Sequence, residues 1–263
     1  MNQKISIITV VYNDEKHIGH TIESVINQTF PNIEYLIIDG GSNDATVEVI
    51  NTYKSKIQVV VSEPDKGIYD AMNKGIALSS GDWLLFINSG DYIKTNHSIE
   101  QIHPYLSNPG GAEIIYGDVS IFSEEFNVMH DLKARDISVI TNNTVMSHQA
   151  CFIKRDLIAN NKYDLRYKIA ADYHFVLKCF LAGVKIMQLP ETISVISSGG
   201  ISDANRLRAF KEFLKIRNEL NKSFRNNINY YKEVCYMQFI KIIKKIIPHA
   251  NYSRLYKYKY KIK

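Results

Sequence analysis

The chain has 263 residues, of which 45% are hydrophobic and 22% charged, and its formal net charge is +5. This composition is typical of a globular soluble protein, and the length allows one large α/β domain with an appendage. No apolar run approaches the roughly 20 residues that cross a bilayer, and no signal-peptide pattern is found at the start. The three cysteines are widely spaced, which argues against a disulfide framework or a zinc site. We therefore expect a cytoplasmic protein with reduced core thiols.

The positive charge is concentrated at the end of the chain. Residues 234–263 contain eight Lys or Arg residues and no Asp or Glu, and subtracting these eight charges from +5 leaves about −3 for residues 1–233. The body of the protein is therefore mildly acidic, and the basic tail needs an explanation of its own.

Strand and helix patterns alternate through the first 90 residues. Apolar strand-like segments are predicted at 4–12, 33–38, 57–61 and 83–87. Helical spacing of apolar residues follows the first three of them, beginning at Ile18, after Asp44 as a cap, and over 68–78. This alternation predicts a parallel, doubly wound sheet.

Each predicted strand ends on polar or small residues. These ends are Tyr12-Asn13, Asp39-Gly40-Gly41, Glu63-Pro64-Asp65 and Asn88-Ser89-Gly90-Asp91. In a parallel sheet they meet along one edge, which predicts a ligand cleft there. Neither GxGxxG after the first strand nor GxxxxGK[ST] occurs, which disfavours dinucleotide and P-loop sites. Asp91 could hold a hard cation that grips a diphosphate, although ordinary turn chemistry would also explain its segment.

The second half has less regular patterns. Strands are predicted at 114–122, 127–132, 149–153, 184–189 and 192–197, with helices opened by Asp156 and Asp172 and further helices at 204–221 and 230–247. Gly199-Gly200 resembles a hinge beside a loop that closes over the ligand. We expect one domain over 1–222, followed by a basic, amphipathic helical extension over 223–263.

Four motifs, at 7–13, 37–44, 63–75 and 86–91, resemble in order and spacing those of family 2 glycosyltransferases of the GT-A type. His148-Gln149 and residues 171–173 extend the resemblance, which is greatest to bacterial enzymes that build surface polysaccharides such as capsule or colanic acid. It implies a Rossmann-like, mostly parallel sheet flanked by helices, with a nucleotide-binding half (1–95) and an acceptor-binding half (96–222). It also implies inverting transfer of a sugar from a nucleotide-diphosphate sugar, which we expect to be UDP-linked, to a glycan acceptor that is lipid-linked or an oligosaccharide.

The resemblance also assigns a nucleotide pocket. Its implied members are Thr9, Tyr12, Asn13, Asp39, Lys66, Gly67 and Asn73. Asp39 would accept a hydrogen bond from a pyrimidine N–H, while Lys66 and Gly67 would lie near ribose and phosphate. The alternatives are that Asp39 is a turn residue and that Lys66 is a solvated surface charge.

Two acids carry the implied chemistry. Asp91 would ligate Mg²⁺ or Mn²⁺, but Gly90 stands where the family often has a first Asp, so one carboxylate remains. Asp172 would be the base that takes the acceptor's proton, with Ala171 in place of the family's usual first acid; a helix N-cap is the alternative. The residues expected to contact acceptor or donor sugar are Ser89, Gly90, His148 and Gln149. An ordinary half-buried histidine would equally explain His148.

The basic tail is predicted to be an amphipathic helix on an anionic membrane surface. Phe239 and Ile242 would lie on its apolar face, opposite Lys241, Lys244 and Lys245. This would place the protein at the inner face of the cytoplasmic membrane. A helix packed on the domain or a homodimer contact are the alternatives, and no nucleic-acid partner is expected. The rival functions are a non-catalytic nucleotide-sugar binding protein and another nucleotidyl-dependent transferase on the same fold.

Overall fold

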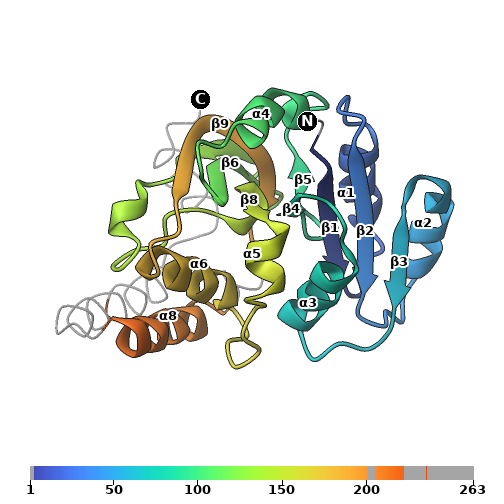
Figure 1. The fold of residues 1–263 in the computed structure, drawn as a ribbon. Helices are drawn as coiled ribbons and strands as arrows, with labels where there is room; N and C mark the ends of the chain where they lie inside the picture. Colours follow the sequence, from blue (N-terminus) through green and yellow to red (C-terminus); the bar gives the residue numbers. More distant parts are fainter. Residues whose placement is uncertain (1–2, 201–204, 222–234, 236–263) are drawn as a thin grey trace.

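The structure is a computed structural model that describes residues 3–200, 205–221 and 235, and its described part is a single sheet with helices on both faces (Figure 1). The strands are β1 Ile5–Val11, β2 Ile33–Asp39, β3 Val59–Ser62, β4 Trp83–Phe86, β5 Tyr92–Ile93, β6 Ile114–Ser123, β7 Val128–Leu132, β8 Cys151–Lys154 and β9 Ile186–Ser197. The helices are α1 Ile18–Ile26, α2 Thr46–Thr52, α3 Ile68–Leu78, α4 Ser98–Ser107, α5 Arg155–Ala159, α6 Ala171–Leu181 and α8 Arg206–Leu220. Short 3₁₀ turns are η1 Lys54–Lys56, η2 Ile137–Val139 and η3 His148–Ala150.

The first half is parallel, in the order β3-β2-β1-β4. All seven residues of β1 are buried, because both faces of this strand are covered. Ile8 and Val10 belong to the core beneath α3, and Ile5 and Ile7 to the core beneath α1 and α2. The expected α/β sheet with flanking helices is confirmed, and continuous apolar runs are the usual pattern for parallel strands buried on both faces.

The strand register brings the polar ends together. Val11 lies opposite Asp39, which lies opposite Ser62, so β1, β2 and β3 end level with one another. Beyond the end of β4 the chain continues beside β1, where Ser89 N donates to Val10 O at 3.1 Å. The four predicted strand ends therefore lie along one edge of the sheet.

The second half extends this sheet with strands of mixed direction, since β8 runs antiparallel to β4 and β6 whereas β9 runs parallel to β6. Several predictions are corrected here. The two strands predicted at 184–189 and 192–197 are one strand, β9, which continues through Pro190. Three β9 residues, 189–191, oppose the single residue Gly117, and this bulge accommodates the proline. A Cβ at Gly117 would lie 2.5 Å from the Glu191 carbonyl oxygen, so only glycine allows the close approach.

Other second-half elements also differ from the sequence prediction. Residues 148–150 form the 3₁₀ turn η3, and the strand expected from residue 149 begins at Cys151. Helix α4 and the short strand β5 were not predicted, and α4 contains Pro104, which is atypical of a helix interior. Its buried Ile99, Ile102 and Leu106 nevertheless have helical spacing. Cys151 and Cys179 are buried as expected, whereas Cys235 is exposed.

The predicted helix at 230–247 lies outside the described residues, apart from Cys235. The same holds for Phe239, Lys241, Ile242, Lys244 and Lys245, which were predicted to face a membrane. Helix α8 is described from Arg206 to Leu220, close to the predicted span of 204–221. None of the described helices combines the length and apolar character of a membrane span.

Packing of α3 on the sheet predicts the effect of one core substitution. A Cβ at Gly75 would lie 2.5 Å from Ile8 Cγ2, which the stiff, β-branched isoleucine cannot easily avoid. We expect Gly75→Ala to lower the free energy of unfolding by about 1–3 kcal/mol in urea titrations, despite the better helix propensity of alanine. Gly200→Ala, which adds a methyl group to open space, is the control and should change stability by less than about 1 kcal/mol. Equal stability of the two variants would contradict the packing.

Candidate active site

A large cavity lies at the carboxyl ends of the parallel strands, where the topology predicts a ligand site. One wall is built from the segments that follow β1, β2, β3 and β4. The opposite wall comes from the second half: residues 144–149, the start of α6, the segment after β9 and the inner side of α8. Two carboxylates, Asp91 and Asp172, line this cavity from different elements.

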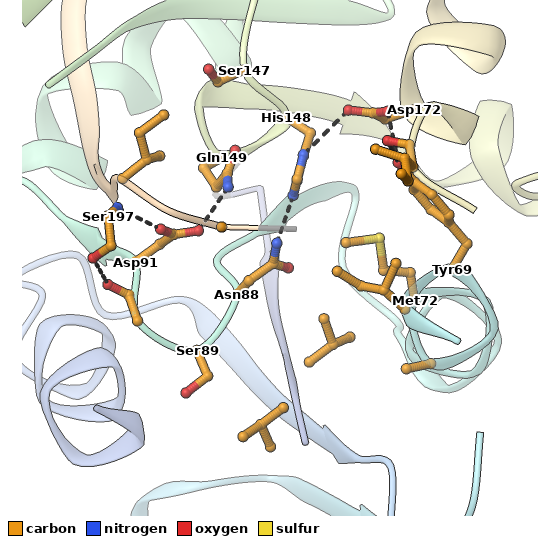
Figure 2. Close-up of a pocket in the computed structure, with 18 of the residues that line it drawn as sticks. Tyr69, Met72, Asn88, Ser89, Asp91, Ser147, His148, Gln149, Asp172 and Ser197 are labelled. Atoms are coloured by element: carbon orange, nitrogen blue, oxygen red, sulfur yellow. Dashed lines mark hydrogen bonds and ion pairs between the residues drawn. The ribbon is translucent and has the colours of Figure 1, made fainter. Parts of the chain in front are cut away.

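Asp91 follows β4 and is only 7% exposed. Its Oδ1 accepts the Ser197 backbone N–H at 3.0 Å, and its Oδ2 accepts the Gln149 Nε2–H at 2.7 Å (Figure 2). Burial raises the pKa of Asp91 to about 6, and the two hydrogen bonds only partly offset that effect. A carboxylate in this state is stabilised by any cation that reaches it.

A second acid, Asp14, stands beside this position. Its Oδ2 accepts the Ser89 hydroxyl at 2.6 Å, and a Cβ at Gly90 would lie 3.8 Å from the same oxygen. The open space at Gly90 is therefore bordered by a carboxylate from the β1–α1 loop. No group of three or more His, Cys, Asp or Glu residues that could hold a metal occurs in the described ranges. The available donors are oxygens, which fits a hard cation that takes its remaining ligands from phosphate and water.

Asp172 lies at the start of α6 and is held by donors on both oxygens. Tyr69 OH donates to Oδ1 at 2.8 Å, and His148 Nδ1 lies 3.3 Å from Oδ2. His148 Nε2 lies 3.0 Å from Asn88 Nδ2, so a polar chain runs from Asp172 to the end of β4 (Figure 2). Burial by itself would raise the pKa of Asp172, but the hydrogen bond and charge of His148 and the Tyr69 hydroxyl hold that pKa below its usual value.

The η3 turn connects the two acids. Its consecutive residues His148 and Gln149 contact Asp172 and Asp91 respectively, and Figure 2 shows their side chains reaching toward different acids. The structure thus brings His148, Gln149, Ser89 and Gly90, all singled out from the sequence, into one cavity.

The predicted nucleotide residues divide into two groups. Tyr12, Asn13 and Gly67 line the cavity, and the Tyr12 side chain is conspicuously open, with the residue 60% exposed. Asn13 is one of two non-glycine residues with positive φ in the described chain, and its Oδ1 accepts the Asn43 backbone N–H at 2.8 Å. These residues are placed where a nucleotide could reach them.

Thr9, Asp39, Lys66 and Asn73 are not among the residues that line the cavity, and their contact with a nucleotide stays a prediction. Thr9 is fully buried and its hydroxyl lies 3.0 Å from Tyr35 OH. Asn73 exchanges two 2.9 Å hydrogen bonds with the Tyr163 backbone, so its amide is occupied by the fold. Lys66 lies beside the cavity, where its carbonyl accepts Lys168 Nζ at 3.3 Å.

Sequence reasoning assigned no individual role to several cavity residues, among them Asp14, Asn88, Tyr69 and Ser197. The first three stand within or next to the motifs at 7–13, 63–75 and 86–91, so proximity to a motif was the available signal. Ser197 carries no such signal, because only the path of β9 brings its backbone N–H to Asp91.

The buried state of Asp91 predicts a dependence of stability on pH. Its folded pKa of about 6 lies above the ordinary value of 3.8, so the folded state carries a penalty that is full above pH 6 and is relieved as pH falls toward 4. We expect Asp91→Asn to raise the free energy of unfolding at pH 8 by about 1–3 kcal/mol, and by much less at pH 4.5. Urea titrations at both pH values test this, with Glu48→Gln on the surface as the control. A gain that does not depend on pH would contradict the burial of a charged Asp91.

Residues 6–164 match the protein family described as Glycosyl transferase family 2. A PGL/p-HBAD biosynthesis glycosyltransferase of Mycobacterium bovis (strain BCG / Pasteur 1173P2) is 29% identical over 216 residues, which are 80% of this chain and 82% of the relative. An uncharacterized glycosyltransferase of Mycobacterium tuberculosis (strain CDC 1551 / Oshkosh) is 35% identical over 184 residues, which are 67% of this chain and 69% of the relative.

The fold is similar to that of two solved transferases. Staphylococcus aureus TarS 1–349 in complex with UDP aligns with a TM-score of 0.60 and 18% identity, over 83% of this chain and 66% of that chain. The mannosyltransferase PcManGT from Pyrobaculum calidifontis in complex with GDP-Man and Mn²⁺ aligns with a TM-score of 0.64 and 15% identity, over 81% of this chain and 63% of that chain. Because the family match spans more than half of the chain, this protein belongs to glycosyltransferase family 2, and its fold is of the GT-A type.

Proposed function

We propose that this glycosyltransferase moves a sugar from a UDP-sugar to a hydroxyl of a lipid-linked glycan, with inversion at the anomeric carbon and with the help of a divalent cation. The observation that carries the proposal is the pairing of Asp91 and Asp172 across one cavity by the consecutive η3 residues Gln149 and His148. Their electrostatic states differ, because the pKa of Asp91 is raised and that of Asp172 is lowered. Such divergence is typical of carboxylates with separate roles in one site.

The donor would lie along the strand ends. Tyr12 offers an aromatic face, Asn13 a polar group and Gly67 a bare backbone with φ of +119°. The diphosphate would then lie over Ser89, Gly90 and Asp91, where β4 ends beside β1. UDP is supported by its presence in the TarS complex, whereas the second solved structure holds GDP-Man.

Asp91 would hold the cation, with Asp14 as a neighbouring carboxylate and the donor's phosphates as further ligands. Held there, Mg²⁺ or Mn²⁺ would supply positive charge beside the departing nucleoside diphosphate. We expect weak cation binding without nucleotide, because Asp91 and Asp14 would leave most of the cation's ligand positions to phosphate and water. Mn²⁺ in the PcManGT complex supports the use of a divalent cation in this fold.

Asp172 would act as the base. A bond forms between the acceptor oxygen and the anomeric carbon while the bond from that carbon to the diphosphate breaks, and the acceptor's proton passes to a carboxylate oxygen of Asp172. A single displacement with one base inverts the anomeric configuration, by the logic of inverting glycosidases. Tyr69 and His148 would keep the carboxylate ionised and oriented until the acceptor arrives.

The acceptor is proposed from chemistry at two places. The cavity wall beyond Asp172 has apolar side chains, among them Ile140, Val145 and Phe213, which suit an acceptor with an apolar part. The basic tail, proposed to lie on an anionic membrane at the cytoplasmic face, would bring the site to a lipid-linked glycan. We propose bacterial surface-polysaccharide synthesis as the pathway class, and a homodimer contact as the alternative role of the same tail.

A non-catalytic nucleotide-sugar binding protein is the second candidate, favoured by the absence of acids at Gly90 and Ala171. Residue 171 is a buried alanine, so it supplies no second acid beside Asp172. This candidate requires nucleotide binding without any transfer.

Asp172→Asn separates the two candidates. We expect this variant to lose transfer by about 10²–10⁴-fold, because the amide cannot accept the proton, while UDP affinity with Mn²⁺ changes less than twofold. Transfer would be followed as UDP release from a panel of UDP-sugars with membrane extracts as acceptor source, and binding by calorimetry. Asp156→Asn, on the surface outside the cavity, is the control. Full activity of Asp172→Asn would remove Asp172 as base, and nucleotide binding by a wild type that transfers no sugar would favour the second candidate.

A further inference from the structure

The acid that the motifs assign to base recognition is already fully used by the fold. Asp39 is 0% exposed, and its oxygens accept the backbone N–H groups of Gly41 and Ser42 and the hydroxyls of Ser42 and Ser62. These bonds shape the turn after β2 and link it to the end of β3. A base that reached Asp39 would have to displace donors that the turn itself needs.

A different carboxylate, Asp65, faces the cavity from the end of β3. Lys74 Nζ lies 2.6 Å from its Oδ1 and 2.9 Å from Glu63 Oε1, so one oxygen of Asp65 is anchored to α3. Its Oδ2 receives no hydrogen bond from the described residues. The side chain is 10% exposed, and burial raises the pKa of Asp65 against the opposing effect of Lys74. An acceptor that has lost most of its water and has one free oxygen is suited to a ligand N–H.

Gly40 keeps this oxygen open to the cavity. A Cβ at residue 40 would lie 2.9 Å from Asp65 Oδ2 and 3.4 Å from Tyr12 Cδ2. The carboxylate oxygen and the ring of Tyr12 therefore border the same small space, which any side chain at residue 40 would fill. Tyr12 is 60% exposed, so its ring is available for stacking with a planar base.

We propose that Asp65 is the residue that selects the base of the donor, by accepting the N3–H of a uracil stacked on Tyr12. This inference rests on the proposed function, because it assumes a nucleotide donor in this cavity. Cytosine presents an unprotonated N3 at that edge, which a carboxylate repels. Guanine offers two adjacent donors that would match both carboxylate oxygens, but Lys74 already occupies Oδ1. The single free oxygen therefore favours uracil.

The test is calorimetric titration of UDP, CDP and GDP, each with Mn²⁺, into wild type, Asp65→Asn and Glu63→Gln. We expect wild type to bind UDP at least tenfold more tightly than CDP or GDP. Asp65→Asn should weaken UDP binding at least tenfold and narrow or reverse the preference over CDP, because an amide can donate to cytosine N3 and accept from its amino group. Glu63→Gln is the matched control, since it removes a 57% exposed partner of the same Lys74 without facing the base, and should leave every affinity within twofold.

A second variant tests the same proposal in case Asp65→Asn does not fold. Gly40→Ala places a methyl group in the space between Asp65 Oδ2 and the Tyr12 ring. This variant should bind UDP at least tenfold more weakly, while its melting temperature stays close to that of wild type. Wild-type preference for UDP over CDP in a folded Asp65→Asn would overturn the role of Asp65 and leave the proposed function standing. Absence of binding of any nucleoside diphosphate to wild type would overturn the proposed function itself.

Discussion

Burial of β1 on both faces is the constraint on which the rest of the structure depends. Its side chains alternate between the core under α3 and the core under α1 and α2, so the strand cannot shift by one residue without exchanging the two sets. Its backbone pairs with β2 on one side and β4 on the other. The position of β1 therefore sets one wall of the cavity. Tyr12 to Asp14 follow β1 directly, Gly40 lies beside the end of β1, and Ser89 lies where the chain beyond β4 continues along β1.

The short η3 turn adds the second constraint. Its neighbouring residues Gln149 and His148 contact two different acids. Burial raises the pKa of Asp91, the partner of Gln149, whereas the pKa of Asp172, the partner of His148, is lowered. A carboxylate with a raised pKa is a good partner for a cation that arrives with phosphate, and one with a lowered pKa stays ready to accept a proton at neutral pH, although the same stabilisation weakens it as a base. Through this turn and Ser197 at the end of β9, the second half of the chain contributes direct contacts to both acids of the site.

Absent side chains matter as much as present ones. Gly117 allows β9 to bulge over Pro190, Gly75 allows α3 to lie close to Ile8, and Gly40 leaves open the space between Asp65 and Tyr12. Gly90, where the family often has an acid, borders Asp14. Motif comparison describes Gly90 as a lost ligand, whereas the structure shows a carboxylate from another loop beside that position.

The sequence by itself determined the parallel half of this protein. Strands buried on both faces require continuous apolar runs, and the turns that follow these strands contain Gly, Pro and Asp. Strands β1, β2 and β4 and helix α3 were predicted closely, and so was the gathering of polar strand ends at one edge. Tertiary structure decided which members of the motifs face the cavity. Asp39 and Asp65 are both acids that follow strands, and only their contacts show the difference between them. The Asp39 oxygens accept the hydrogen bonds of a turn, whereas Asp65 pairs with Lys74 through one oxygen and keeps the other free. It likewise decided the partners of Asp91 and Asp172, because Ser197 and His148 are distant in sequence and arrive through strand pairing and a 3₁₀ turn that no local pattern encodes.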